Sequence, residues 1–114
     1  QGNYIGGVIL PGLRVSLNSL SGKTAQLPYI SLEVPNKVIG KNTIDCMRAG
    51  IVFSNVDMID GILDRMEKEL GETPTVIATG GLARFITPLC RHEIIFDDAL
   101  LLKGLLILYR KNTQ

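Results

Sequence analysis

The sequence predicts a mixed α/β fold with an aliphatic core, and three observations lead to this class. Hydrophobic residues make up 46% of the 114 residues but aromatic residues only 5%, so Ile, Leu, Val and Ala should form the core. Apolar runs typical of strands alternate along the chain with segments whose apolar residues recur at helical spacing. One such run passes through a glycine pair directly into a helical pattern. The length fits one domain, or part of one.

The first third of the chain is predicted to contain two strands and a short helix. Residues 4–10 are apolar and β-rich, and the turn-like residues 1–3 before them are typical of a hairpin. Because a strand leaving a hairpin turn needs a partner, we expect the preceding strand, and so part of the domain, to lie upstream. Residues 13–20 carry leucines at helical spacing, and residues 29–34 alternate like a half-buried strand.

The strongest helix signal covers residues 42–70. Asn42 and Thr43 are a good helix start, apolar residues at helical spacing follow, and Gly71 is a typical helix end. Charged residues occupy the opposite face, where i,i+4 pairs contribute about 0.2–0.5 kcal/mol each and have no catalytic role. The predicted pairs are Asp64 with Lys68 and Arg65 with Glu69.

The last third of the chain is predicted to contain, in order, a strand, a turn, a helix, a second strand and a final helix. Residues 74–78 form a short apolar run, residues 79–81 a glycine turn, and residues 82–89 resume helical spacing. A strand-like piece follows at residues 93–96. The final helix is predicted over residues 97–111, with acidic residues at its start and cations in its last turn, as the helix dipole prefers.

Charge and hydropathy argue against two classes of partner. Twelve basic and eleven acidic residues leave the chain near neutral, and the sequence has no cluster of Lys and Arg that could bind nucleic acid or anionic lipid. The longest apolar run, residues 99–109, is interrupted by Lys103 and is too short to span a bilayer. We expect a cytoplasmic protein that binds neither nucleic acid nor membrane.

The cysteines and the single histidine predict no metal site. Cys46 and Cys90 are far apart and lack CxxC spacing, so buried free thiols are favoured over a disulfide or a metal. His92 has no close ligand companion in sequence beyond Cys90 and Glu93.

Two glycine-rich segments and one threonine are candidate binding residues. At Thr79, Gly80 and Gly81, missing side chains would let backbone N–H groups approach a nucleotide or phosphate, although strand-Gly-Gly-helix also occurs as tight packing. The segment is neither a Walker loop nor a GxGxxG fingerprint.

For Gly6 and Gly7 the alternative to binding is a bulge before a turn. The hydroxyl of Thr43 either caps the helix or faces a substrate, and Asn42 can cap instead.

Five motifs occur in a fixed order over nearly the whole chain, and together they resemble type III pantothenate kinases. They are GGVILPG (residues 6–12), TAQLP (24–28), IGKNT (39–43), ATGGLA (78–83) and LLKGLLILYRKN (101–112). The resemblance implies the actin-like, sugar-kinase-like ATPase fold, in which two ribonuclease-H-like lobes enclose ATP. Residues 1–114 would then be most of the C-terminal lobe, incomplete at its N-terminus.

The same resemblance implies a function. Such enzymes use ATP, with magnesium and a monovalent cation (potassium or ammonium), to convert pantothenate to 4′-phosphopantothenate, the first step of coenzyme A biosynthesis. A threonine matching Thr43 contacts pantothenate, and the active site lies at a homodimer interface. Thr79, Gly80 and Gly81, with Gly6 and Gly7, would lie towards the nucleotide.

The resemblance also implies that the catalytic machinery lies elsewhere. The phosphate-binding DxGNT, the GADR segment with the catalytic aspartate and the DxGTA loop of the family would all precede residue 1, in an N-terminal half of the same protein. We therefore expect no catalytic residue in this chain, and no activity from it alone.

Two other classes of function stay open from the sequence. One is a regulatory or interaction protein of the Bvg accessory factor type. The other is a dimerisation module without catalysis, in which helix 43–70 pairs with itself through Met47 and Ile51.

Overall fold

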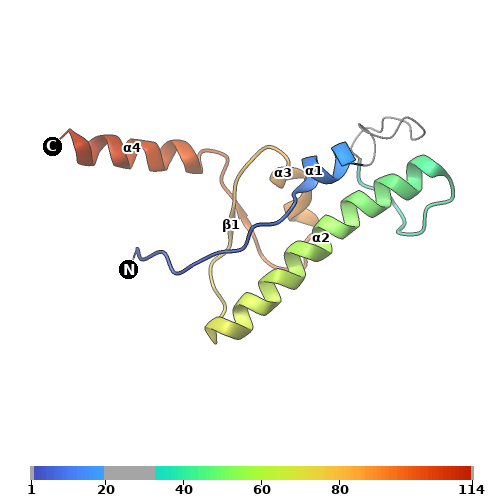
Figure 1. The fold of residues 1–114 in the computed structure, drawn as a ribbon, viewed down its shortest axis with the longest axis horizontal. Coiled ribbons are helices and arrows are strands. Elements are labelled where there is room, and N and C mark those ends of the chain that lie inside the picture. The colour runs from blue at the N-terminus through green and yellow to red at the C-terminus, as the bar shows by residue number, and fades with distance from the viewer. Residues whose placement is uncertain (1, 20–32, 114) are drawn as a thin grey trace.

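The computed structural model of the chain describes residues 2–19 and 33–113 and confirms the mixed α/β class. A long helix is central, and a two-stranded sheet and several short helices surround it (Figure 1). In order, the elements are α1 (Leu13–Leu17), α2 (Thr43–Leu70), β1 (Ile77–Ala78), α3 (Ala83–Ile86), the 3-10 helix η2 (Thr87–Leu89), β2 (Ile95–Phe96) and α4 (Leu100–Asn112).

Both ends of α2 are fixed by local hydrogen bonds, which confirms the bounds predicted for this helix. Asn42 has extended backbone geometry, and its side-chain oxygen accepts a hydrogen bond from the Asp45 backbone N–H at 2.9 Å. At the other end Gly71 has a φ of 75°, and its N–H donates to the Glu67 carbonyl at 2.9 Å. Only glycine adopts this left-handed geometry without steric cost.

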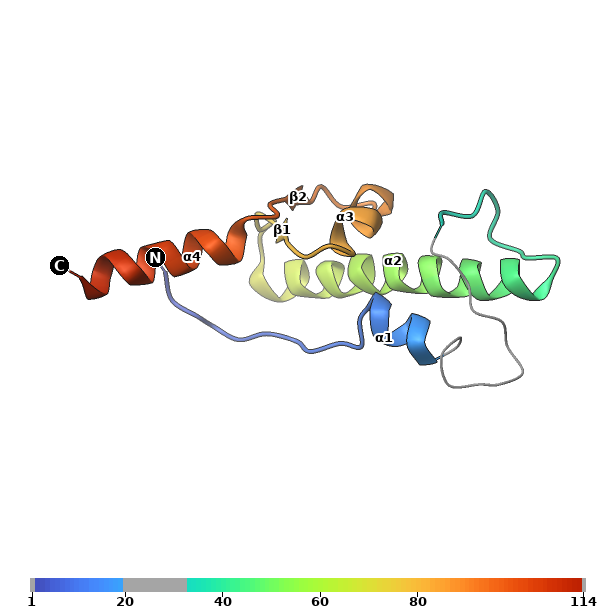
Figure 2. The same cartoon turned by 90° about the horizontal axis from the view of Figure 1, so that it is seen from above.

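The core forms where α1 and α3 pack on α2. Figure 2 shows α1 on one side of α2 and α3 with the two strands on the other. Ile51 and Val52 on α2 are 1% and 0% exposed, so they are the centre of this core. The buried cluster consists of Leu13, Met47, Ile51, Val52, Val56 and Ile86.

The burial of Met47 and Ile51 corrects one sequence-based hypothesis. Both side chains face the chain's own core, so the hypothesis of a dimerisation module that pairs through them is wrong. A residue cannot fill an intramolecular core and an intermolecular interface with the same surface.

The two strands form a parallel pair, with Ile77 opposite Ile95 and Ala78 opposite Phe96. The Ile95 N–H donates to the Val76 carbonyl and the Asp97 N–H to the Ala78 carbonyl, both at 2.9 Å. The strands predicted at residues 74–78 and 93–96 are therefore confirmed, but each is only two residues long.

The strand predicted at residues 4–10 does not form. The segment is extended and exposed, with Ile9 98% accessible. A strand is defined by its hydrogen-bonded neighbour, and no described segment pairs with this one. Of the strand predicted at residues 29–34, only Glu33 and Val34 are described, and they are not in a strand. Of the helix predicted at residues 13–20, α1 covers Leu13–Leu17, residues 18–19 continue it as a π-helical turn, and residue 20 lies outside the described residues.

α4 begins after a short acidic turn and projects away from α2 (Figure 1). The Asp97 carboxylate accepts from the Ala99 N–H at 3.0 Å and from Lys103 Nζ at 2.8 Å. The Lys103 hydrogen bond, followed by that of Ala99, lowers the pKa of Asp97. Every residue of α4 is exposed, including its leucines. No helix within the described residues is both long and apolar enough to cross a membrane.

The molecule is more open than a compact domain of this size. Its radius of gyration is 17.3 Å, against about 13 Å expected for a compact chain of about 100 residues. The excess reflects α4 and the extended residues 2–12, which expose much of the chain's apolar surface.

Truncating the core of α2 should destabilise the chain. Ile51→Ala leaves a cavity between α1, α2 and α3, so we expect a loss of about 2–5 kcal/mol in the free energy of unfolding, measured by urea denaturation. Ile39→Ala is the matched control, because Ile39 is 77% exposed, and should change the value by less than about 0.5 kcal/mol. Equal losses in the two variants would contradict this core.

Candidate functional site

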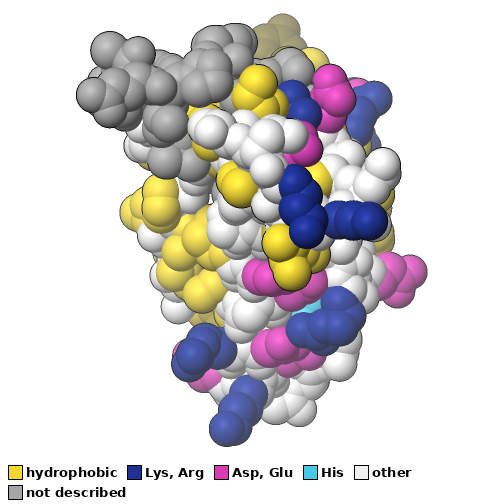
Figure 3. Space-filling view, turned by 90° about the vertical axis from the view of Figure 1, so that its right-hand side faces the viewer, with side chains coloured by type: hydrophobic (Ala, Val, Ile, Leu, Met, Phe, Trp, Pro, Cys, Tyr) yellow, Lys and Arg dark blue, Asp and Glu magenta, His cyan; other side chains and the backbone are white. Residues whose placement is uncertain are grey.

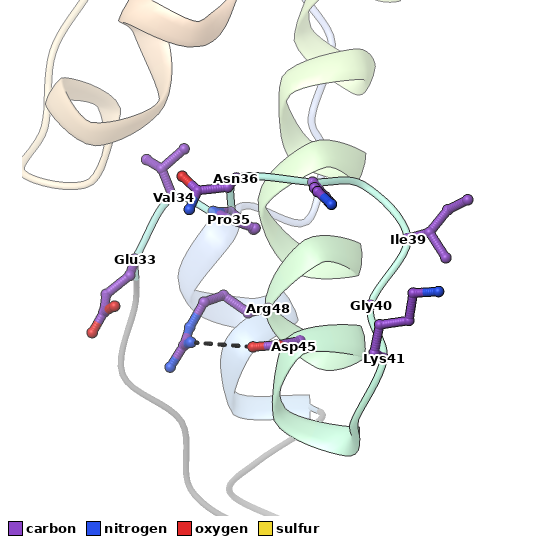
Figure 4. A pocket seen from close by; sticks show the side chains of 10 residues that line it. Glu33, Val34, Pro35, Asn36, Ile39, Gly40, Lys41, Asp45 and Arg48 are labelled. Atoms are coloured by element: carbon purple, nitrogen blue, oxygen red, sulfur yellow. Dashed lines mark ion pairs between the residues drawn. The ribbon is translucent and has the colours of Figure 1, made fainter.

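The IGKNT segment forms a cavity with the first turns of α2. The cavity has a volume of ≈ 360 Å³ and is lined by residues of loop 33–41 together with Asp45 and Arg48 (Figure 4). In Figure 4 the loop curves around the start of the helix, and the Arg48 side chain lies inside this curve. A small polar ligand fits a space of this size and lining.

Gly40 allows the loop to approach the helix this closely. A Cβ atom on Gly40 would lie 2.5 Å from the backbone nitrogen of Cys46 and 2.8 Å from the backbone carbonyl carbon of Asp45. Both are main-chain atoms that cannot rotate away. The glycine of IGKNT is therefore required by packing.

The charges around the cavity are mixed. Lys37, Lys41 and Arg48 contribute cations, and Glu33 and Asp45 contribute carboxylates. Arg48 Nη1 lies 3.8 Å from Asp45 Oδ1, a loose ion pair at the edge of the usual range. An anionic group with neighbouring hydroxyls would find partners of both kinds here.

Thr43 is the first residue of α2 and is exposed. Because Asn42 makes the capping hydrogen bond, the Thr43 hydroxyl is not needed for that purpose. Thr43 does not line the cavity itself, but it lies between Lys41 and Asp45, which do.

The glycine turn that follows β1 is a separate feature. Thr79, Gly80 and Gly81 are exposed, and Gly80 has a φ of 106°, a conformation that favours glycine. None of the three lines the cavity at loop 33–41. The helix that the turn leads into, α3, has only four residues.

Gly6 and Gly7 lie against the other half of α2. With Ile5 and Val8 they face Met66 and its neighbours across a second cavity of ≈ 340 Å³. The Gly6 φ is 141°, again in the region that favours glycine. The structure thus does not gather the five predicted nucleotide-proximal residues and Thr43 into one cavity.

The cysteines differ from the expectation of two buried thiols. Both are free, but Cys46 is exposed and Cys90 is only half-buried. Burial, with smaller contributions from the carboxylates of Asp60 and Asp57, raises the pKa of the Cys90 thiol. The Cys90 thiol therefore lacks the lowered pKa of a reactive cysteine.

A second polar cluster was not predicted from the sequence. The His92 cluster, consisting of His92, Asp60, Asp64 and Glu67, joins the C-terminal half of α2 to the segment before β2. The expectation that His92 has no ligand companion beyond Cys90 and Glu93 is wrong, because three carboxylates of α2 reach its ring. Figure 3 shows the chain's only histidine (cyan) among acidic and basic side chains.

Asp60 holds the segment 91–92 in place. Its carboxylate accepts from the backbone N–H of Arg91 at 2.7 Å and of His92 at 3.1 Å, and it lies 2.7 Å from His92 Nδ1. Burial acts to raise the pKa of Asp60, but these hydrogen bonds and the nearby imidazole together lower it below its ordinary value. Asp60 is therefore an ionised acceptor, and His92 Nδ1 carries the proton between them.

Asp64 has a different partner from the predicted one. Its Oδ2 lies 2.6 Å from Arg91 Nη2, and this hydrogen bond lowers the pKa of Asp64. The predicted i,i+4 ion pair between Asp64 and Lys68 is therefore wrong. Among the described residues, no ion pair joins Arg65 to Glu69 either. A charged partner 27 residues away is preferred over one on the next helical turn.

Comparison with known proteins points to one family. The family described as type III pantothenate kinase matches residues 1–65. Three curated relatives carry that name: the chain is 40% identical over 113 residues to one from Syntrophus aciditrophicus, 44% over 110 residues to one from Bacillus cytotoxicus, and 44% over 112 residues to one from Pelobacter propionicus. These alignments cover 99%, 96% and 98% of the chain but only 44%, 42% and 44% of the relatives. The chain thus spans less than half their length.

The Gly40 contact leads to a paired prediction. Gly40→Ala should displace loop 33–41 from α2 and lower the free energy of unfolding by about 1–3 kcal/mol, measured by urea denaturation. Gly61→Ala is the control, because Gly61 is exposed within α2 with no atom near its missing side chain. Alanine there should stabilise the helix by up to about 1 kcal/mol. Stabilisation by both changes would contradict the close approach at Gly40.

The Asp60 hydrogen bonds predict a pH dependence. Because the folded pKa lies below the unfolded value of about 3.9, Asp60 stabilises the fold above that pH, and this stabilisation is lost as the pH falls through the folded pKa. Asp60→Asn should therefore lower the free energy of unfolding at pH 7 by about 1–3 kcal/mol. The free energy of unfolding of this variant should also fall less steeply as the pH is lowered.

The measurement is urea denaturation from pH 7 to pH 2. Asp57→Asn, an exposed change on the same helix, is the control and should follow the unsubstituted chain. If the free energy of unfolding of Asp60→Asn fell as steeply at acid pH as that of the unsubstituted chain, this account would be ruled out.

Proposed function

Because the chain belongs to the type III pantothenate kinase family, we propose that it forms part of an enzyme that transfers a phosphoryl group from ATP to the terminal hydroxyl of pantothenate. The product is 4′-phosphopantothenate, and the reaction begins coenzyme A biosynthesis. The observation that carries this proposal is the match to proteins named type III pantothenate kinase over almost the whole chain. Those names favour the enzyme over a regulatory relative.

We place pantothenate at the start of α2. Thr43 is an exposed residue, and because Asn42 caps the helix, its hydroxyl can hydrogen-bond a polar ligand. The neighbouring cavity supplies Lys37, Lys41 and Arg48, which suit the carboxylate of pantothenate. In this proposal the chain binds and orients the substrate, which accelerates phosphoryl transfer by fixing the nucleophile relative to the phosphate.

The nucleotide would lie at the glycine turn after β1. The positive φ of Gly80 and the missing side chains of Gly80 and Gly81 leave backbone N–H groups open to phosphate oxygens. Gly6 and Gly7 lie against the far half of α2, so we assign them no contact with the nucleotide at this turn. Magnesium bound with ATP, and a potassium or ammonium ion, would neutralise the charge on the phosphates.

The rest of the active site would come from outside these residues. The chain spans less than half of its curated relatives, and the family's catalytic aspartate and phosphate loops are expected in the remaining part. The exposed leucines of α4 and the apolar residues 4–10 would contact that part, or a second copy in a homodimer within the cytoplasm.

Removing the Thr43 hydroxyl tests the substrate site. In the complete protein that carries this sequence, Thr43→Val should raise the KM for pantothenate by about 2- to 12-fold, the equivalent of one hydrogen bond of about 0.5–1.5 kcal/mol. The KM for ATP should stay unchanged. A coupled phosphorylation assay measures both. Thr113→Val, beyond the end of α4, is the control. A KM for pantothenate equal to that of the control would remove Thr43 from the site.

Residues 1–114 alone should not phosphorylate pantothenate, whereas the complete protein should. The same assay with ATP, magnesium and potassium compares the two, at protein concentrations up to a hundredfold higher for the shorter chain. Turnover by residues 1–114 would mean that the catalytic groups lie within them, against the proposal.

A further inference from the structure

The ring of His92 is surrounded by carboxylates in an unusual way. Its side chain is only 9% exposed, with Nδ1 2.7 Å from Asp60 Oδ1. On the opposite edge, Nε2 lies 3.0 Å from Asp64 Oδ1 and 3.7 Å from Glu67 Oε2. The phosphoryl-transfer proposal uses none of these groups.

The hydrogen bond at Nδ1 leaves the other ring nitrogen as a ligand. Asp60 already accepts two backbone N–H groups, so it acts as an acceptor and Nδ1 as the donor. In the neutral imidazole Nε2 then carries a lone pair. Three electron-rich atoms consequently converge: Nε2 and one oxygen each from Asp64 and Glu67. Such an arrangement is stabilised by a cation at its centre.

We propose that His92 Nε2, Asp64 Oδ1 and Glu67 Oε2 bind a divalent transition-metal ion of the zinc class. Histidine nitrogen and carboxylate oxygen are both zinc ligands, at about 2.0–2.2 Å from the ion. For a tetrahedral ion, that bond length places neighbouring ligand atoms about 3.3–3.6 Å apart. The observed separations of 3.0 and 3.7 Å bracket this range, and all three ligand atoms lie within 4.8 Å of one another.

The surroundings suit a bound ion. Asp60 holds the ring as carboxylates hold zinc-binding histidines, through the nitrogen that does not bind the metal. Arg91 binds Oδ2 of Asp64 and leaves Oδ1 towards the ring. The three carboxylates of the cluster outnumber this single guanidinium, so the site has a net negative charge before the ion binds.

A cavity beside the ligands leaves room for a further ligand. It has a volume of ≈ 330 Å³ and is lined by His92 and Glu67 together with Glu93 and Thr73. A water molecule could complete a tetrahedron from this side, as in zinc sites with three protein ligands. The ion would join the C-terminal half of α2 to the segment leading into β2, and its binding should stabilise the fold.

The test is titration of the complete, chelator-treated protein with Zn²⁺ in the absence of nucleotide, followed by calorimetry and thermal unfolding. Because Cys46 is an exposed thiol that could bind zinc by itself, all proteins carry Cys46→Ser. We expect one ion per chain and a Tm that rises with zinc concentration. Co²⁺ in place of Zn²⁺ should give visible absorption of a four-coordinate N/O site without a thiolate band.

Substitutions identify the ligands. Glu67→Gln should weaken binding at least about tenfold, and because Glu67 is 28% exposed and not bonded to the backbone of segment 91–92, this variant should keep its fold. His92→Gln should abolish binding, and Asp60→Asn should weaken it about 10- to 100-fold. Glu93→Gln, which changes a carboxylate of the same cavity outside the proposed ligands, is the matched control.

Three results would overturn the site. They are no zinc binding above that of His92→Gln, equal binding by Glu67→Gln and Glu93→Gln, and a cobalt–thiolate band from Cys90. The first would mean that a second proton on His92, rather than a metal, balances the carboxylates. Pantothenate phosphorylation enters none of these measurements, so failure of the metal site and failure of the proposed function are distinguishable.

Discussion

α1 and α3 are held in place by one apolar stripe of α2. Ile51 and Val52 lie at its centre, and Leu13 and Ile86 reach it from segments far apart in the sequence. Because α2 is fixed at both ends by its own caps, this stripe has a defined length and direction. Loop 33–41 packs on one end of the same helix, and the His92 cluster joins the other end to the sheet. The two candidate sites are therefore positioned by a single helix.

The features that the sequence predicts well are those determined by neighbouring residues. Asn42 and Gly71 mark the ends of α2 because a side-chain cap and a left-handed glycine act within one helical turn. The positions of β1 and β2 also follow from short apolar runs, but their two-residue length does not, because each pairs only with the other in the described chain.

Predictions failed where a distant partner decides the outcome. Residues 4–10 have the composition of a strand, yet no described segment pairs with them, and they remain extended. Asp60, Asp64 and Glu67 lie on one face of α2, a pattern visible in the sequence, but their common partner His92 comes about 30 residues later. Only the packing of the segment before β2 on α2 brings it there. For Thr43, capping by Asn42 leaves the hydroxyl available to a ligand, but only the family resemblance indicates that this ligand is pantothenate.

The central claim is that the start of α2 binds pantothenate. The most direct measurement is a crystal structure of the complete protein with pantothenate and a non-hydrolysable ATP analogue. The account predicts pantothenate between loop 33–41 and the first turn of α2, within hydrogen-bond distance of the Thr43 hydroxyl, with the nucleotide phosphates towards Gly80 and Gly81. Pantothenate bound elsewhere, with Thr43 in contact only with solvent, would contradict it.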